Sequence, residues 1–423
     1  MTKNNYLNVI NSLHEGYVKE AANSMKRAAE EVKETEMSKD FAVSFDGSWQ
    51  KPGYASLNGI VSAISVTTGK VLDYQVKSKR CKGCEIHEKM DKTSEKYLKW
   101  KLNHAFHCGT NHVGSSGAME VGGVKEMYER SVEKNDLRYV SFIGDGDSST
   151  YQTISNAKPY GDDVPIVKKE CVGHVQKRLG TRLRKLKSGK KKLSDGKGIG
   201  GRNRLTDKMI DTMQNYYGLA IRQNKNNLEG MTNDVKAGLY HLASSEQKPQ
   251  HHLCPKGKES WCGWQKDVAT KTKSYKPKRG LPTAVVDAIE PIYEALADKK
   301  LLSRCLDSFT QNPNESLNSL VWKRCPKKVY QGKQVVELCT ASAVAQFNDG
   351  ASSIAAVLKH MGIAPGRNTM TGILKIDKTR QKSAERKCSE KVKNRRKRLR
   401  AIKKGLWDFN KEKEGTIYES GAF

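Results

Sequence analysis

The sequence predicts an α/β fold in which a strand-containing core is interrupted by a long, mostly α-helical insertion. Two regions, residues 40–80 and 137–145, alternate β-branched or aromatic residues with polar ones and end at glycine turns, which is typical of strands. Residues 176–304 have helical spacing and no strand pattern. The chain has 423 residues, 36% of them apolar, so it can bury a sizeable core in about two or three domains.

The first 80 residues predict helix followed by antiparallel strands. Apolar residues in 1–38 recur at helical spacing, which indicates one or two helices. The stretch "FAVSFDGSWQ" then reads as a strand, and residues 56–81 alternate around Gly69 as a hairpin does. Three antiparallel strands are the simplest interpretation.

The rest of the chain divides by its periodicity and charge. We expect a helix over 118–134, then the strand "LRYVSFIGD", which breaks at a Gly-Asp-Gly-Asp turn into another helix. The predicted domains are an N-terminal helical segment (1–40), a first core part (41–175) with an excursion at 81–108, a basic helical insertion (176–304), a second core part (305–365) and a basic C-terminal tail (366–423).

The charge points to a polyanionic partner. The chain carries 76 Lys and Arg against 46 Asp and Glu, a net charge of +30, so nucleic acid is the first partner to consider and an anionic membrane surface the second. No apolar run approaches the roughly 18 residues that span a bilayer, so we expect an intracellular protein without a membrane partner.

The positive charge is concentrated in two windows, residues 176–208 and 380–404, each with 13 basic residues against two acidic ones. A solvated face, a nuclear-import signal and phosphate contacts all remain open for the second window. For the first window we favour contact with nucleic acid, through Lys177, Arg178, Arg182, Arg184, Lys185 and Lys187.

Two aspartates are predicted to follow strands at glycine turns, which exposes a carboxylate at the rim of a sheet where it can bind a metal. They are Asp46 in "VSFDGSW" and Asp145 in "SFIGDGDSS". Asp147 suits the N-cap of the next helix, although the choice between Asp145 and Asp147 stays open. Glu315, in "NPNESLNSLVW", occupies the first turn of a predicted helix, where a metal ligand and a capping-box residue with Asn312 as N-cap are both reasonable.

Cysteine and histidine spacing predicts a structural zinc site. In the series Cys81-x2-Cys84-x19-His104-x3-Cys108, two close pairs each supply two tetrahedral ligands, and His107 is an alternative to His104. A second zinc held by Cys171, His174, Cys254 and Cys262 competes with a set of buried thiols and a hydrogen-bonded histidine. We expect Trp49, Trp261, Trp264 and Trp322 to be core aromatics.

Six ordered motifs resemble those of Mutator-like DNA transposases of eukaryotic mobile elements. They are "FDGSWQKPGYASLNG", "GDGDSSTY", "CVGHVQKRLGTRLRKL", "YYGLAIR", "HHLCPKGKESWC" and "NPNESLNSLVWKRCPKK", and they cover about residues 40–365. The resemblance implies an RNase H-like catalytic core, interrupted by a helical insertion, with a DDE triad at the matching positions Asp46, Asp145 and Glu315. Such a triad holds two Mg²⁺ (or Mn²⁺) ions per active site.

The resemblance also implies an activity and partners. The enzyme would cleave DNA at transposon ends and join the 3′-hydroxyls to target DNA. Its partners would be double-stranded terminal-repeat and target DNA, on which it would act as a homo-oligomer in the nucleus. The alternatives are a domesticated or inactive transposase-derived DNA-binding protein and an RNase H-like nuclease that only hydrolyses.

Overall fold

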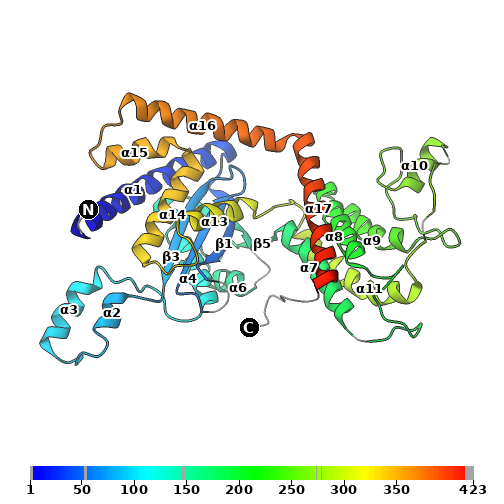
Figure 1. The fold of residues 1–423 in the computed structure, drawn as a ribbon, viewed down its shortest axis with the longest axis horizontal. Coiled ribbons are helices and arrows are strands. Elements are labelled where there is room, and N and C mark those ends of the chain that lie inside the picture. The colour runs from blue at the N-terminus through cyan, green and yellow to red at the C-terminus, as the bar shows by residue number, and fades with distance from the viewer. Residues whose placement is uncertain are drawn as a thin grey trace. The chain divides into compact units, whose positions relative to one another are not determined.

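The computed structural model describes residues 3–51, 55–144, 148–189, 191–272, 274–277 and 279–414 (Figure 1). The chain divides into two compact units. One consists of residues 1–20 and 349–423, and the other of residues 21–348. No helix in the described ranges is long and apolar enough to span a bilayer.

The described residues of the larger unit form a five-stranded mixed sheet in the order β3-β2-β1-β4-β5. Antiparallel pairing joins β1 (Asp40–Trp49), β2 (Asn58–Ser65) and β3 (Val71–Ser78), while β4 (Arg138–Gly144) and β5 (Val167–Glu170) continue the sheet in parallel. The sheet confirms the α/β class and the hairpin, whose turn places Gly69 at φ +69°. Strand β5 was not predicted, because three of its four residues are charged.

Alternation along β1 gives the sheet one apolar and one polar face. Phe41, Val43 and Phe45 are buried in a core shared with α4 (Ser116–Glu129) and with the part of α1 (Lys3–Glu36) that belongs to this unit. Residues 44, 46 and 48 point the other way, because successive side chains in a strand alternate between faces. Their partners are on α13 (Asn312–Arg324), which follows the insertion in sequence.

The structure corrects one expectation about Asp46. Strand β1 does not end at this residue but continues to Trp49, because Gly47, Ser48 and Trp49 pair with Val61, Ile60 and Gly59 of β2. Asp46 therefore lies inside a strand. The predicted aspartates Asp145 and Asp147 lie outside the described residues, which end at Gly144 and resume at residue 148.

The insertion has a hydrophobic core of its own. Its helices are α7 (Val172–Ser188), α8 (Asp207–Gln223), α9 (Leu228–Ala243), α10 (Gly263–Thr270), α11 (Thr283–Leu296) and α12 (Lys299–Ser303). Residues from α7, α8, α9, α11 and α12 form one buried cluster, which includes Leu179, Met213, Val235, Ile289 and Leu302. As predicted, no named strand occurs among the described residues of 176–304.

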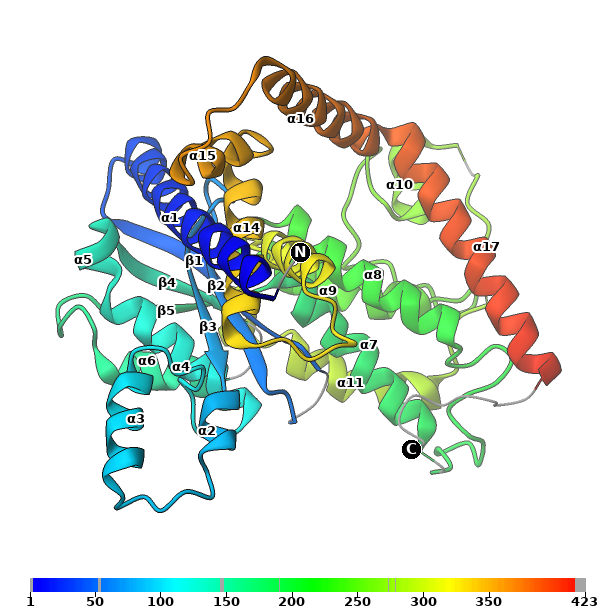
Figure 2. The same cartoon turned by 60° about the vertical axis from the view of Figure 1, so that its left-hand side comes forward.

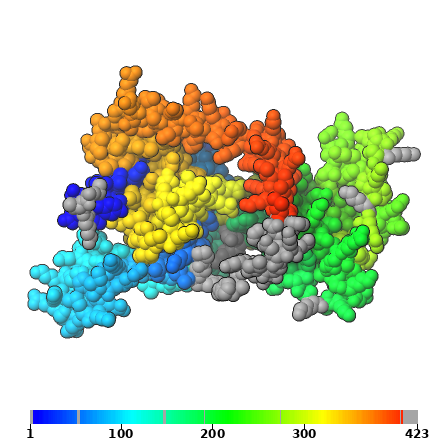
Figure 3. Space-filling view, in the orientation of Figure 1, coloured from blue at the N-terminus to red at the C-terminus, as the bar shows by residue number. Residues whose placement is uncertain are grey.

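An excursion follows β3 and carries α2 (Lys82–Ile86) and α3 (Glu95–Ala105), which project from the sheet in two views (Figures 1 and 2). In the space-filling view it forms the cyan lobe (Figure 3). The remaining elements of the larger unit are α5 (Ser131–Asn135), α6 (Ser148–Ala157) and α14 (Lys333–Asp349), whose last residue already belongs to the smaller unit.

The smaller unit joins the start of α1 to α15 (Ser352–His360), α16 (Arg367–Cys388) and α17 (Glu390–Glu414). Buried Glu20 pairs with His360, with 3.1 Å between Oε2 and Nε2. The basic tail is helical up to Glu414, because its charged residues alternate with apolar ones such as Leu399 and Ile402 at helical spacing.

Candidate active site and metal clusters

Helix α13 is fixed to β1 by side-chain hydrogen bonds spaced along one helix face. Asn314 Nδ2 donates to the Ser44 carbonyl (3.1 Å), while Ser44 Oγ donates to Asn314 Oδ1 (2.8 Å). One turn later, Asn318 Nδ2 donates to Asp46 Oδ2 (2.7 Å). The next turn places Trp322 Nε1 2.7 Å from Ser48 Oγ, to which it donates.

This polar seam sets the register of the helix. Asn314 and Ser44 are buried, and buried polar groups are costly unless they are hydrogen-bonded. A shift of α13 by one residue would break the whole series. The seam thus fixes where the first turn of α13, with Glu315, stands relative to Asp46.

Asp46 and Glu315 line one pocket of about 590 Å³, together with Asn318, Trp322 and Lys327. Glu315 is the more exposed acid, with a side chain 57% accessible to solvent. Burial lowers the pKa of Lys327, which lies over the Trp322 ring at 5.0 Å. Two residues distant in sequence, 46 and 315, therefore present carboxylates to the same space.

The capping-box interpretation of Glu315 is wrong. Helix α13 begins at Asn312 with Gln311 as its N-cap, and Gln311 makes no side-chain cap hydrogen bond. Instead, Gln311 Nε2 donates to the Phe45 carbonyl (2.6 Å), because this residue faces the sheet. Glu315 is therefore one position beyond the capping-box site.

Helix α7 brings positive charge to Glu315. Lys177 Nζ lies 3.8 Å from Glu315 Oε1, and both side chains are more than half exposed. His174, Lys177, Arg178, Thr181 and Arg182 surround a shallow hollow of about 310 Å³ on the same helix. A basic helix face thus starts beside the candidate acids.

Four of the six predicted DNA-contacting cations have partners within the protein, and the exposed pair of Lys177 with Glu315 is one of them. Arg178 pairs with buried Glu170 at 2.8 Å. Arg184 and Lys187 pair with acids of α8 at 2.6 and 2.9 Å, because α7 and α8 pack side by side. Within the described residues, neither Arg182 nor Lys185 forms an ion pair, and both are exposed.

The first Cys/His cluster contains the four side chains predicted from spacing. One donor atom from each of Cys81, Cys84, His104 and Cys108 lies within 4.8 Å of the others. His104 Nε2 is 3.3 Å from both Cys81 Sγ and Cys84 Sγ, and Cys84 Sγ is 3.6 Å from Cys108 Sγ. The structure places His104 in the cluster rather than His107.

Backbone N–H groups around this cluster stabilise the thiolate form of Cys81, which is the form that binds a metal. Burial alone would raise the pKa of Cys81, but backbone N–H groups of Cys84, Gly109 and Gly83 donate to its sulfur and lower the pKa to about 6. Burial and the neighbouring thiols of Cys108 and Cys81 raise the pKa of Cys84 to about 12. A thiolate is the metal-binding form of cysteine, so the N–H groups favour metal binding.

The second cluster differs from the predicted ligand set. Cys254 and Cys262 meet His241 and His251, with one donor atom of each within 4.8 Å of the others. Cys171 and His174 are not members, because Cys171 is the buried N-cap of α7 and His174 lies on the hollow of that helix. Burial lowers the pKa of His251, which favours the neutral, metal-binding imidazole.

The four tryptophans predicted as core aromatics are all only partly buried. Two of them contact histidines of the second cluster. Trp264 stacks on His251, and Trp261 contacts the edge of His241. Trp322 lines the pocket described above, and Trp49 Nε1 donates to the Ser116 carbonyl (2.8 Å).

The sequence did not predict the residues that join α13 to β1, nor His241, and the predicted ligand set for the second cluster had Cys171 and His174 in place of His241 and His251. Asn314, Asn318 and Trp322 are four residues apart, so a polar stripe on a helix face was visible in the sequence. His251 had a spacing signal, because His251-x2-Cys254 is a close pair within "HHLCPKGKESWC", whereas His241 had none.

Comparison with known protein families identifies the family of the chain. The family model for Mutator-like transposases matches residues 1–262, more than half of the chain, and the matched region includes Asp46 and both Cys/His clusters but ends before Glu315. No curated protein and no solved structure matches the chain. The chain belongs to the Mutator-like transposase family.

Proposed function

We propose that this protein is a DDE transposase, which cleaves DNA at transposon ends and transfers the 3′-hydroxyls into target DNA. Family membership supports a transposase that acts on DNA. The observation that carries the finer proposal is the docking of α13 on β1, since it brings Asp46 and Glu315 to one pocket. We infer that the five-stranded sheet is the RNase H-like core expected from the motifs.

The proposed third acid is Asp145. Strand β4 lies beside β1 in parallel, with Ile143 opposite Ser44, and its described part ends at Gly144. The chain thus leaves β4 at the end of the sheet where Asp46 lies. Asp147 remains the alternative to Asp145, and both are outside the described residues.

The donor atoms around this pocket suit a hard cation. Asp46 and Glu315 offer carboxylate oxygens, which Mg²⁺ and Mn²⁺ prefer. Because a carboxylate only accepts hydrogen bonds, Asn318 must present Nδ2 to Asp46 and direct Oδ1 elsewhere. Oδ1 is buried and has no hydrogen-bond partner among the described residues. This oxygen could therefore accept a hydrogen bond from water or coordinate a cation.

The chain's own residues have distinct roles in the proposed reaction. Asp46, Asp145 and Glu315 would hold two Mg²⁺ (or Mn²⁺) ions, which when bound activate the attacking water or 3′-hydroxyl and stabilise the leaving oxygen. Asn318 is a positioning residue, because its hydrogen bond orients the Asp46 carboxylate. Lys177 neutralises part of the charge on Glu315 before DNA and metal are bound.

Helix α7 would guide the DNA backbone towards the acids. Its exposed cations, Lys177, Arg182 and Lys185, can contact phosphates without breaking buried ion pairs. Phosphate contacts release counterions, so binding through this face weakens as salt rises. Arg178, Arg184 and Lys187 would instead support the helix through their partners in the protein.

The first Cys/His cluster would hold a structural zinc. No residue of α2 or α3, both fully described, is buried. The excursion therefore has no hydrophobic core, and a tetrahedral metal site can supply the missing folding energy. We further propose that the basic tail directs the protein to the nucleus, where it acts on DNA as a homo-oligomer.

The test is an in vitro reaction with Mg²⁺, a duplex carrying the terminal repeat of the flanking genomic element, and a target plasmid. Joined products are expected. Hydrolysis without joining would mean a nuclease, and retention of the DNA without either would mean a DNA-binding protein.

Matched variants test whether the acids of the pocket are required for this reaction. Asp46→Asn and Glu315→Gln should abolish joining while DNA is still retained. Asp163→Asn and Glu229→Gln, two exposed acids outside the pocket, should join normally. Joining that survives Glu315→Gln would mean that the third acid lies elsewhere in the chain.

A further inference from the structure

We propose that His241, His251, Cys254 and Cys262 form a Cys₂His₂ zinc site that holds the distal part of the insertion together. This inference does not depend on the transposase activity. It rests on the donor distances, on the groups that orient the histidines, and on the lack of a hydrophobic core in the surrounding loop.

The distances between donor atoms suit tetrahedral zinc. Zn–S and Zn–N bonds of about 2.3 and 2.0 Å place tetrahedral ligand atoms roughly 3.3–3.8 Å apart. Cys262 Sγ lies 3.5 Å from His251 Nδ1, and Cys254 Sγ lies 3.6 Å from His241 Nδ1. The third such distance, from Cys254 Sγ to His251 Nδ1, is 4.0 Å.

His251 is oriented as metal-binding histidines are. Its Nδ1 faces the sulfurs, while Nε2 lies 2.9 Å from Ser244 Oγ, which also accepts from the Gln250 N–H (3.0 Å). A hydrogen-bond acceptor at the far nitrogen fixes the tautomer and leaves the near nitrogen free for a metal. Gln265 Nε2 donates to the His251 carbonyl (2.8 Å) and fixes the backbone as well.

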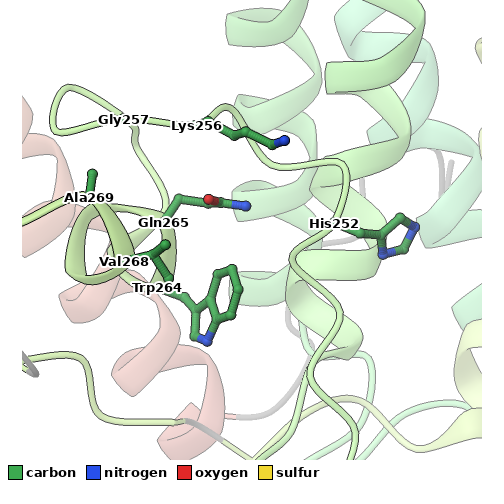
Figure 4. A pocket seen from close by; sticks show the side chains of 7 residues that line it. All are labelled: His252, Lys256, Gly257, Trp264, Gln265, Val268 and Ala269. Carbon is green, nitrogen blue, oxygen red and sulfur yellow. The ribbon is translucent and has the colours of Figure 1, made fainter. Parts of the chain in front are cut away.

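Aromatic rings close the site on two sides. Trp264 stacks on His251 with 5.2 Å between ring centroids, and Trp261 meets His241 edge-on at 4.9 Å. Trp264 and Gln265 also border a pocket of about 510 Å³, in which His252 points away from them (Figure 4). His252 is exposed, meets the Tyr240 ring at a tilt of 43°, and is not a member of the cluster.

The loop around the cluster lacks a hydrophobic core. Among the described residues of 245–280, the buried ones are His251, Cys254, Ser260, Cys262 and Gln265, and none of them is aliphatic or a Phe, Tyr or Trp. Three of the five belong to the cluster, and the other two make hydrogen bonds within or next to it. Such a segment cannot order itself by burying apolar surface, whereas a bound metal contributes its binding energy to folding.

The fourth ligand explains what the zinc would do. His241 lies in the last turn of α9, whose other face packs in the core of the insertion. A zinc ion would therefore join the loop and α10 to a helix that is already stable. Without it, residues 245–280 would be held to α8 and α9 by ring contacts such as Trp261 with Tyr216 and His252 with Tyr240.

The test measures zinc in the purified full-length chain, prepared without chelators. Elemental analysis should find two zinc ions per chain, one for each cluster. Cys262→Ser and His241→Ala should each lower the content by one ion, as should Cys84→Ser in the first cluster. His252→Ala and Cys171→Ala are the matched controls and should leave it unchanged.

Cobalt substitution distinguishes the two clusters even if a variant folds poorly. The absorption of Co²⁺–thiolate charge transfer grows with the number of cysteine ligands. Cobalt in the Cys84→Ser protein should therefore report two thiolates, and cobalt in the Cys262→Ser protein three. A wild-type protein with one zinc that Cys84→Ser removes completely, or a Cys254–Cys262 disulfide found by mass spectrometry of the native protein, would overturn the proposal.

Discussion

The excursion at residues 81–108 and the loop at residues 245–280 both lack a hydrophobic core among their described residues, yet their Cys/His clusters are assembled differently. In the first, all four side chains come from one short segment. In the second, three side chains of the loop meet His241, which belongs to the helix before it. The first cluster is partly exposed, whereas three of the four residues in the second are buried.

The two clusters show when residue spacing is sufficient to identify a metal site. The pairs Cys81-x2-Cys84 and Cys171-x2-His174 have the same spacing, and both begin a helix, with Cys81 as the N-cap of α2 and Cys171 as the N-cap of α7. Only the first pair has a second pair of ligands beside it, His104 and Cys108 of the same segment, whereas Cys254 and Cys262 lie with His241 and His251. A short spacing therefore identifies a metal site only where the fold brings a second pair of ligands to it.

The largest expected effect is local unfolding of the segment that each cluster holds together, after one of its cysteines is replaced. Cys262→Ser should release the loop from α9 and lower its local free energy of unfolding by several kcal/mol, since zinc binding contributes about 10–16 kcal/mol in zinc-finger peptides. Hydrogen exchange should then rise across 245–280 but not in 81–108. Cys84→Ser should give the reverse pattern. Equal loss of protection in both segments after either change would mean that the clusters are not independent.

The next effect tests the choice between neighbouring histidines in the first cluster. His104→Ala removes a side chain that contacts two sulfurs, so zinc affinity should fall by more than the roughly 10–100-fold typical of an outer-shell change. His107→Ala is the matched control, and competition with a chelating dye measures both. A larger loss with His107→Ala would move the ligand to that residue.

A smaller effect is expected from glycine in the Cys-Lys-Gly-Cys turn. A Cβ at Gly83 would lie 2.7 Å from His104 Cε1, so Gly83→Ala should displace the ring and lower zinc affinity about 10–100-fold, as outer-shell changes do. A Cβ at Gly198 would meet no atom within 4 Å, and Gly198→Ala should leave affinity unchanged. Unchanged affinity in both variants would show that the ring position is not critical.

The smallest effect compares the aromatic covers of the two clusters. Trp100 stacks on His104 at 4.6 Å and Trp264 on His251 at 5.2 Å, both at 14° between planes. Replacement of either tryptophan by leucine should lower the free energy of unfolding by about 0.5–1.5 kcal/mol more than the loss of buried apolar area alone would. Thermal unfolding of the two single variants measures this. A cost several-fold larger at Trp264 would mean that it also supports the insertion in another way.

The elements that depend on a local pattern of residues could be predicted. Alternating residues predicted the hairpin at Gly69, and helical spacing predicted α1 and α4. Apolar burial dominates these elements, so the period of the hydrophobic residues is sufficient to identify them. Spacing alone also identified the three cysteines of the first cluster and limited its histidine to His104 or His107, because one short segment contains them all.

Contacts between segments that are distant in sequence could not be predicted and depend on the tertiary structure. It extended β1 past Asp46 through pairing with β2, and it selected His241 for the second cluster by where α9 ends. It also placed Asn318 on Asp46 and engaged Arg184 and Lys187 with α8. Polar side chains such as these have several possible partners, and their choice follows from packing that no local pattern of residues encodes.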